Sequence, residues 1–233
     1  MKIPFTIEQF LEVFKNYNLS VWPLQIIFYL LALIAILLSL KKVRQSDKII
    51  PAILAFFWIW MGIVYHIINF TAINTAAYIF GAAFIFQGIL FLYIGFIKQK
   101  ISFQFHSDIY GIAGSIFIFF ALILYPVLGY LQGHRYPSSP TFGLPCPTTI
   151  FTFGILLWTD KKFPMALPIV PVIWSVIGFS AAFALGIKED IGLLISGLLF
   201  TFLIVFWNKK LRKTKIGLIH KKSSARHIHQ TFQ

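Results

Sequence analysis

Seven apolar stretches, separated by short polar segments, set the strongest limit on what this chain can fold into. They cover residues 22–40, 49–70, 76–97, 109–131, 147–158, 165–187 and 190–207. A hydrocarbon core about 30 Å thick needs roughly 20 apolar residues in a helix, and all of these stretches except the fifth approach that length. The chain is 58% hydrophobic and only 12% charged, more apolar surface than a soluble core of this size can bury. The sequence therefore predicts an all-α integral membrane protein.

The fifth apolar stretch is short and follows irregular sequence. The string PTFGLPCPTTIFTFG, residues 140–154, holds three prolines, two glycines and the only cysteine of the chain. A helix here would cross the bilayer only if it began near Thr141, among those prolines. Irregular backbone at membrane depth is tolerated where protein or water supplies its hydrogen-bond partners. We therefore expect about seven transmembrane helices, the fifth of them short and irregular or re-entrant.

The lysines and arginines are concentrated in every second connecting segment, as a protein with seven spans requires. With the N-terminus outside, sixteen of the 20 basic residues fall in cytoplasmic loops and the C-terminal tail, and only Lys2, Lys15, Arg135 and Lys188 lie outside. Short cytoplasmic loops of membrane proteins carry such an excess of positive charge. Without the fifth span, the basic tail would lie outside. The distribution predicts an outside N-terminus and an inside C-terminus.

The chain divides into three parts on this interpretation. Residues 1–21 form an extracytoplasmic amphipathic helix on the membrane surface, which begins with a capping box of Thr6 and Gln9. Residues 22–207 form the seven-helix bundle. Residues 208–233 form a basic cytoplasmic tail, which we expect to be disordered and to contact anionic lipids. The tail lacks interleaved aromatic residues, so we do not expect a nucleic acid partner.

Polar residues gather near the outer ends of the predicted spans and define a candidate ligand site. The candidates are His66, Asn69, Gln87, Tyr125, His134, Arg135, Cys146, Thr148, Glu189 and Asp190. His66 and Asn69 are three residues apart, which places them on one helix face. Two adjacent acids suit the positive N-terminus of the last helix.

The string around the cysteine predicts a helix start. Cys146 would stand near the N-cap, where a thiol can become reactive, and Pro147 would occupy the first turn, where its missing N–H costs nothing. Thr148 would satisfy backbone groups of this turn with its side chain.

Binding or permease-like transport of a small polar solute or ion, through an outward-facing polar pocket, is the favoured function. Arg135 would clamp an anion or complement Glu189. One alternative is a membrane-embedded thiol- or metal-dependent enzyme that uses Cys146 with His134 or His66 as base. The chain has no HExxH motif or Ser/His/Asp pattern, so we favour a function that is not enzymatic. Another alternative is a structural or accessory subunit. The sequence identifies no cofactor, metal or oligomeric state.

Several strings together resemble a known family. They are PFTIEQFLEVFKNYN, followed by VWP, then WMGIVYH, GYLQGHRYP, PTFGLPCPTTIFTFG and KEDIGLL. They are similar to an uncharacterised bacterial family of multi-pass membrane proteins, a domain of unknown function whose members are in some cases labelled permeases. The resemblance runs to about Trp207 and implies a bacterial cytoplasmic (inner) membrane protein. It implies no activity.

The predicted orientation is open to a direct test. A reporter enzyme that works only in the cytoplasm, fused after Ala225, is expected to be active because the basic tail stays inside. A reporter that works only in the periplasm, fused at the same residue, is expected to be inactive. Activity of the periplasmic reporter would reverse the predicted topology.

Overall fold

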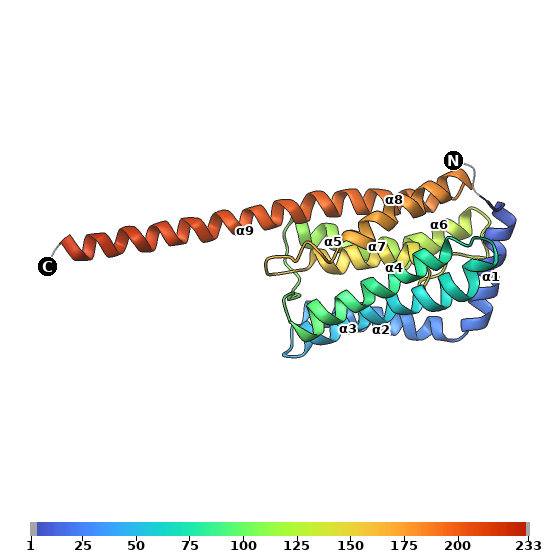
Figure 1. Cartoon of the computed structure of the whole chain (residues 1–233), viewed down its shortest axis with the longest axis horizontal. Helices are drawn as coiled ribbons and strands as arrows, with labels where there is room; N and C mark the ends of the chain where they lie inside the picture. Colours follow the sequence, from blue (N-terminus) through green and yellow to red (C-terminus); the bar gives the residue numbers. More distant parts are fainter. Residues whose placement is uncertain (1–3, 232–233) are drawn as a thin grey trace.

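The helices of this chain follow one another with short connections and no strand among the described residues (Figure 1). The computed structural model describes residues 4–231, and side chains as far as Leu211. The helices are α1 (Ile7–Val21), α2 (Leu24–Leu40), α3 (Ser46–Trp60), α4 (Ala77–Leu90), α5 (Ile109–Phe119), α6 (Tyr125–Leu131), α7 (Pro145–Leu157), α8 (Ile169–Ala184) and α9 (Ile191–Thr231). Three π-helical segments, η1 (Met61–Asn69), η3 (Phe91–Ile97) and η4 (Phe120–Leu124), prolong α3, α4 and α5, and two short 3₁₀ turns are η2 (Phe70–Ala72) and η5 (Lys188–Asp190).

These elements form helical rods that run back and forth between two ends of a bundle (Figure 1). In chain order the rods are α2, α3 with η1, α4 with η3, α5 with η4 and α6, α7, α8 and α9. Segments 41–45, 98–108 and 158–168 meet at one end, which we call the loop end. Helix α1 and the segment 132–144 close the opposite end, which we call the α1 end.

Several of these rods are able to cross a membrane. Four are long and apolar enough by length and composition, namely Ser46–Ala72, Ala77–Ile97, Ile109–Leu131 and Lys188–Leu211. A fifth is possible if α1 and α2, which are bent by 85° relative to each other, are taken as one broken span. Helices α7 and α8 are apolar but shorter. Large apolar side chains are exposed along α2, α4, α5, α8 and α9, a surface that suits lipid better than water. The all-α prediction is confirmed.

Helix α1 begins with the capping box that the sequence indicates. The Thr6 backbone N–H donates to Gln9 Oε1 at 2.9 Å, and the Gln9 N–H donates to Thr6 Oγ1 at 3.3 Å. The apolar face of α1, however, packs on the bundle instead of lying free for the membrane surface. Phe10 stands 5.9 Å from the ring of Phe70, because the aromatic side chains of the two elements cluster together.

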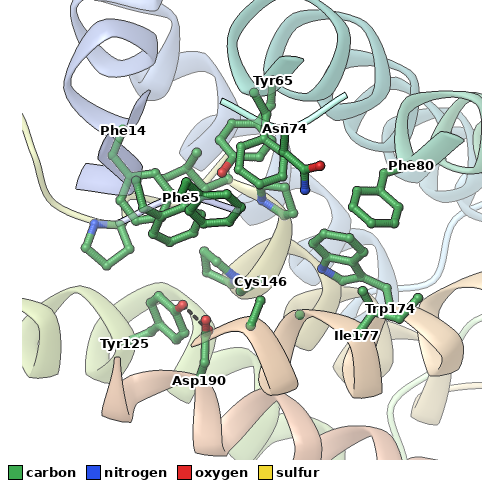
Figure 2. Close-up of a pocket in the computed structure, with 18 of the residues that line it drawn as sticks. Phe5, Phe14, Tyr65, Asn74, Phe80, Tyr125, Cys146, Trp174, Ile177 and Asp190 are labelled. Atoms are coloured by element: carbon green, nitrogen blue, oxygen red, sulfur yellow. Dashed lines mark hydrogen bonds between the residues drawn. The ribbon is translucent and has the colours of Figure 1, made fainter. Parts of the chain in front are cut away.

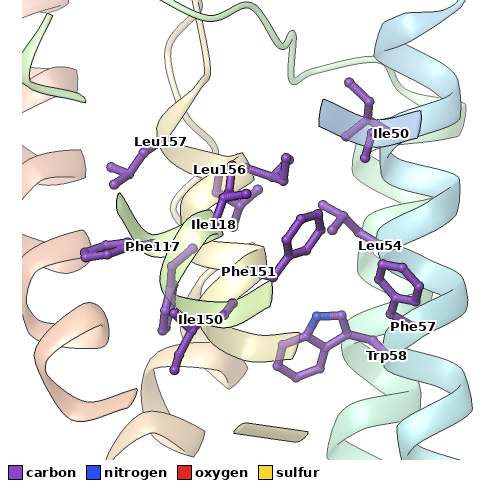
Figure 3. Packing of buried hydrophobic residues seen from close by; sticks show 14 of the residues in the cluster. Ile50, Leu54, Phe57, Trp58, Phe117, Ile118, Ile150, Phe151, Leu156 and Leu157 are labelled. Atoms are coloured by element: carbon purple, nitrogen blue, oxygen red, sulfur yellow. The ribbon is translucent and has the colours of Figure 1, made fainter. Parts of the chain in front are cut away.

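Helix α7 lies at the centre of the bundle. Twelve of its 13 residues are buried, among them Phe151 and Leu156. Figure 3 shows Phe151 and Leu156 among side chains of α3 and α5. Gly114 of α5 and Gly154 of α7 allow a close approach, since a Cβ on Gly154 would stand 2.8 Å from the Gly114 carbonyl oxygen. At 1.5 Å per residue α7 is about 20 Å long, shorter than a bilayer core of about 30 Å.

The irregular chain before α7 obtains its hydrogen bonds from α1. Asn18 Nδ2 donates to the carbonyl oxygens of Pro137 and Ser139, at 2.7 and 2.8 Å, and the Tyr17 hydroxyl donates to the Gly143 oxygen at 2.9 Å. The helix starts at Pro145 and not near Thr141, because Gly143 adopts a φ of +103°, outside the helical region. The backbone partners that the sequence led us to expect are therefore supplied by protein.

The loop end is held by a small polar cluster. Lys42 Nζ lies 2.8 Å from Asp160 Oδ2 and 3.6 Å from Asp47 Oδ2. The Ser102 hydroxyl donates a hydrogen bond of 2.8 Å to Asp47 Oδ2. The oxygen of the same hydroxyl accepts a hydrogen bond from Lys42 Nζ. Partial burial raises the pKa of Asp160, but the hydrogen bond and charge of Lys42 outweigh it, so this pKa lies below its usual 3.8. The cluster ties three loops together.

Helix α9 continues without a break into the basic segment. Its backbone is helical as far as Thr231, and disorder of the tail over 208–233 stays a prediction. The side chains from Arg212 onwards, and residues 232–233, lie outside the described part of the chain.

Replacing Lys42 with methionine is expected to lower the free energy of unfolding by about 1 kcal/mol, since two carboxylates lose their cation. The temperature of unfolding in detergent measures this. The pKa of Asp160 is depressed in the folded state. The ionised carboxylate therefore adds its full amount to the free energy of unfolding above the ordinary pKa of 3.8, and this amount is lost as the pH falls below that value. The difference between the wild type and Lys42→Met therefore shrinks in acid. Lys41→Met, at an exposed neighbour, is the control, and equal effects of the two substitutions would contradict the prediction.

Candidate functional site

A cavity of about 100 Å³ lies at the α1 end, between α1, η1, α4, α7, α8 and η5 (Figure 2). Phe5, Phe10 and Phe14, in or just before α1, form part of its wall. The rest is supplied mainly by aromatic and aliphatic side chains, with few polar atoms. The remaining aromatic residues in the lining are Tyr65, Phe70, Phe80, Tyr125 and Trp174.

Asp190 is the one charged side chain among the residues that line this cavity. It lies in η5, directly before α9, and is 2% exposed. The Tyr125 hydroxyl, at the start of α6, donates a hydrogen bond to its carboxylate (Figure 2). The structure thus brings together two of the candidates from the sequence, from segments 65 residues apart.

Glu189 lies beside Asp190 but turns to the loop before α7. Its carboxylate lies 2.9 Å from His134 Nδ1 and accepts a hydrogen bond of 2.6 Å from Gln132 Nε2. The carboxyl side chain is fully buried. A buried carboxylate needs such partners, so this contact fixes the loop against η5. Arg135, which we expected to complement Glu189, is exposed and places its guanidinium over the ring of Tyr130 at 5.3 Å.

Cys146 occupies the first turn of α7, after the N-cap Leu144. It lines the cavity and its thiol lies beside Asp190 and Tyr125 (Figure 2). The enzyme alternative requires a histidine as base next to the thiol. His134 is engaged by Glu189, and neither His134 nor His66 is among the residues that line the cavity with Cys146. The geometry does not assemble the thiol–histidine pair.

His66 lies behind the cavity wall. It is completely buried, and neither ring nitrogen has a hydrogen-bond partner among the described residues. Its ring contacts Phe84 and Trp174, with centroids 4.5 and 5.0 Å away. No oxygen or nitrogen atom of the described residues accepts from the Trp174 indole N–H either, and Trp174 borders the cavity. Sequence reasoning singled out His66 but missed Trp174.

The remaining candidates lie apart from the cavity. Asn69 belongs to η1 like His66 but borders a separate surface hollow, together with Ile68. Its amide donates to the Val64 oxygen at 2.7 Å. Gln87 Nε2 donates to the Leu167 oxygen at 2.8 Å, a packing contact in the bundle interior.

Thr148 has a local structural function. Its hydroxyl accepts a hydrogen bond of 3.1 Å from the Gly143 N–H, so it satisfies the turn that leads into α7. This is the function that the sequence indicated for it.

Two residues of α1 are important for the site, although they were not among the candidates from the sequence. Tyr17 and Asn18 hold the segment 137–144 that borders the cavity, and the Tyr17 hydroxyl also accepts from Trp60 Nε1 at 3.0 Å. Asn18 stands in line with the apolar residues of the helix, and a polar residue at such a position is the signal that was available.

The described residues contain no group of three or more histidine, cysteine, aspartate or glutamate side chains that could hold a metal ion. The two histidines among the candidate residues do not lie together. His134 is held by Glu189, whereas His66 is surrounded by aromatic rings.

A family model described as "Family of unknown function (DUF6064)" matches residues 7–215, and the chain belongs to this family. No curated protein and no solved structure matches the chain. Family membership agrees with the resemblance seen in the sequence, and any statement about activity depends on the site itself.

Replacing Glu189 with alanine is expected to lower the free energy of unfolding by about 2 kcal/mol, because Gln132 and His134 lose a buried acceptor. Glu189→Gln keeps one acceptor oxygen, so its loss is smaller. Lys188→Ala, at the exposed preceding residue, is the matched control. Thermal unfolding in detergent compares the three variants, and an alanine variant as stable as the control would show that the contact does not hold the loop.

Proposed function

We propose that this member of the DUF6064 family is a permease-like protein of a bacterial cytoplasmic membrane, with seven spans, the N-terminus outside and the C-terminus inside. In this proposal, the cavity under α1 binds a small solute that arrives from the extracytoplasmic side. The cavity at the α1 end, bordered by a buried carboxylate, is the observation that carries the proposal.

The arrangement of the rods supports seven spans. Four to five of them meet the length and apolarity that a membrane span needs. Helices α7 and α8 are shorter, but each connects the loop end with the α1 end (Figure 1). The buried position of α7 explains its length, since a helix surrounded by protein need not match the thickness of the lipid.

The distribution of charge supports the orientation. The loop end carries Lys41, Lys42, Arg44, Lys98, Lys100, Lys161 and Lys162 on its connecting segments. The segments of the α1 end carry Lys15, Arg135 and Lys188. By the positive-inside rule, the loop end faces the cytoplasm and the cavity lies near the outer surface. The basic residues that follow Trp207 would then meet anionic lipid head groups of the inner leaflet.

The lining indicates a solute less polar than the sequence suggested. Aromatic rings make up most of the wall, and Asp190 is the one charged group. Pockets of this kind bind a solute by apolar contact and orient it with a few polar groups. Helix α1 covers the cavity with Phe5, Phe10 and Phe14, so entry of a solute requires α1 or these rings to move.

The only cysteine lies in the cavity and reports on its accessibility. Right-side-out and inverted membrane vesicles are treated with 2-(trimethylammonio)ethyl methanethiosulfonate, whose fixed charge prevents it from crossing the bilayer. Intact-protein mass spectrometry is expected to find a mixed disulfide on Cys146 in right-side-out vesicles first, because the cavity opens outwards.

Two controls accompany this experiment. Cys146→Ser is expected to remain unmodified. Gln45→Cys in that background, at an exposed position of the loop end, is expected to react only in inverted vesicles. Modification of Cys146 from the inverted side alone, or from neither side, would refute an outward-opening pocket.

A further inference from the structure

The carboxyl group of Asp190 has no cationic partner within the described part of the chain. The carboxyl group accepts a hydrogen bond from the neutral Tyr125 hydroxyl and lies beside the Cys146 thiol, and the ion pairs among the described residues do not include it. The two basic residues around Glu189 do not pair with Asp190. His134 contacts Glu189, and Lys188 is exposed. An isolated carboxylate in an apolar surrounding is strongly destabilised unless a cation or a proton joins it.

The rest of the wall is suited to a cation that carries alkyl groups. Tyr65, Phe70, Phe80 and Trp174 come from four different elements and border one space of about 100 Å³. The faces of aromatic rings attract cations, most strongly in places from which water is excluded, and aromatic cages bind quaternary ammonium groups. An anion would meet both the carboxylate and the negative ring faces, so the lining disfavours it.

An inorganic cation fits the cavity less well than an organic one. Calcium and magnesium prefer six or more oxygen ligands, and the cavity wall has few polar atoms. The buried Trp174 N–H lies beside the Cys146 thiol, which is a weak acceptor, and no oxygen or nitrogen atom of the described residues accepts from it. It is therefore a donor for a ligand. It would serve an oxygen atom on an organic ligand and would repel a metal ion.

We infer that the cavity selects a small organic cation, an alkylated ammonium with an apolar body, whose charge is recognised by Asp190 and whose alkyl groups are enclosed by the aromatic rings. This inference rests on the proposed function, because it names the solute class of the same pocket. Cys146, beside Asp190, is the position from which the selectivity is measured.

The experiment compares three methanethiosulfonates on the purified full-length chain in detergent. The first carries a 2-(trimethylammonio)ethyl group, the second a 3,3-dimethylbutyl group of the same shape without charge, and the third a 2-sulfonatoethyl group. In each case the Cys146 sulfur attacks the sulfenyl sulfur, a mixed disulfide forms, methanesulfinate leaves, and the thiol proton goes to solvent. Rates are divided by those of a reference cysteine, Ser138→Cys in a Cys146→Ser background.

The cationic reagent is expected to react at least about tenfold faster than its uncharged isostere, and the sulfonate slowest, since a carboxylate acts strongly at short range in an apolar site. Asp190→Asn keeps the size and an oxygen acceptor for Tyr125, and is expected to abolish the preference. Asp190→Glu restores it. Glu12→Gln, which removes an exposed acid of α1, leaves it unchanged and serves as the matched control.

Equal relative rates of the cation and its isostere in the wild type would overturn the inference, whether or not the Asp190 variants fold. So would a preference that persists in Asp190→Asn. Either result leaves the proposed function intact as long as Cys146 reacts from the outside of membrane vesicles. A thiol that is closed to all three reagents would refute both the inference and the proposed pocket.

Discussion

The architecture depends on one requirement, that buried backbone N–H and C=O groups find hydrogen-bond partners within the protein. The chain before α7 is irregular, and side chains of α1 supply its bonds. Asn18 binds two carbonyl groups of this segment and Tyr17 binds a third. This contact holds α1 across the end of the bundle, where its phenylalanines cover the cavity. The position of α1 over the cavity and the course of the chain into α7 thus depend on the same set of hydrogen bonds.

The sequence predicted the helices well where hydropathy alone determines them. The fourth apolar stretch, 109–131, coincides with the rod of α5, η4 and α6, and the third differs by one residue at its start. The predictions from the sequence were less accurate where contacts with other segments determine the start or the buried face of a helix. The start of α7 depends on the left-handed Gly143 and on Tyr17, 126 residues away. The environment of the apolar face of α1 depends on aromatic partners in η1 and η2. The π-helical segments have no hydropathy pattern that would predict them.

The candidate site was predicted in part. Tyr125, His134, Cys146, Glu189 and Asp190 were placed at the same end of the bundle, and there they make direct or neighbouring contacts. Their pairing was not predictable, because it depends on side-chain directions in a loop and a 3₁₀ turn. The aromatic residues that line the cavity could not be predicted from the sequence for a different reason. Among 27 phenylalanines and 6 tryptophans, the few that border a cavity carry no mark in the sequence.

The near-complete burial of α7 has a consequence for biosynthesis. A segment leaving the ribosome is sorted into the bilayer by its affinity for lipid, segment by segment, and helices associate afterwards. Yet α7 is short, contains threonines, and in the finished protein touches other helices on nearly every side. In the proposed seven-span topology, α7 would therefore be stable in the membrane only after its neighbouring helices have packed around it. On that topology α7 is enclosed only once α8 and α9, which pack against it, have also been made.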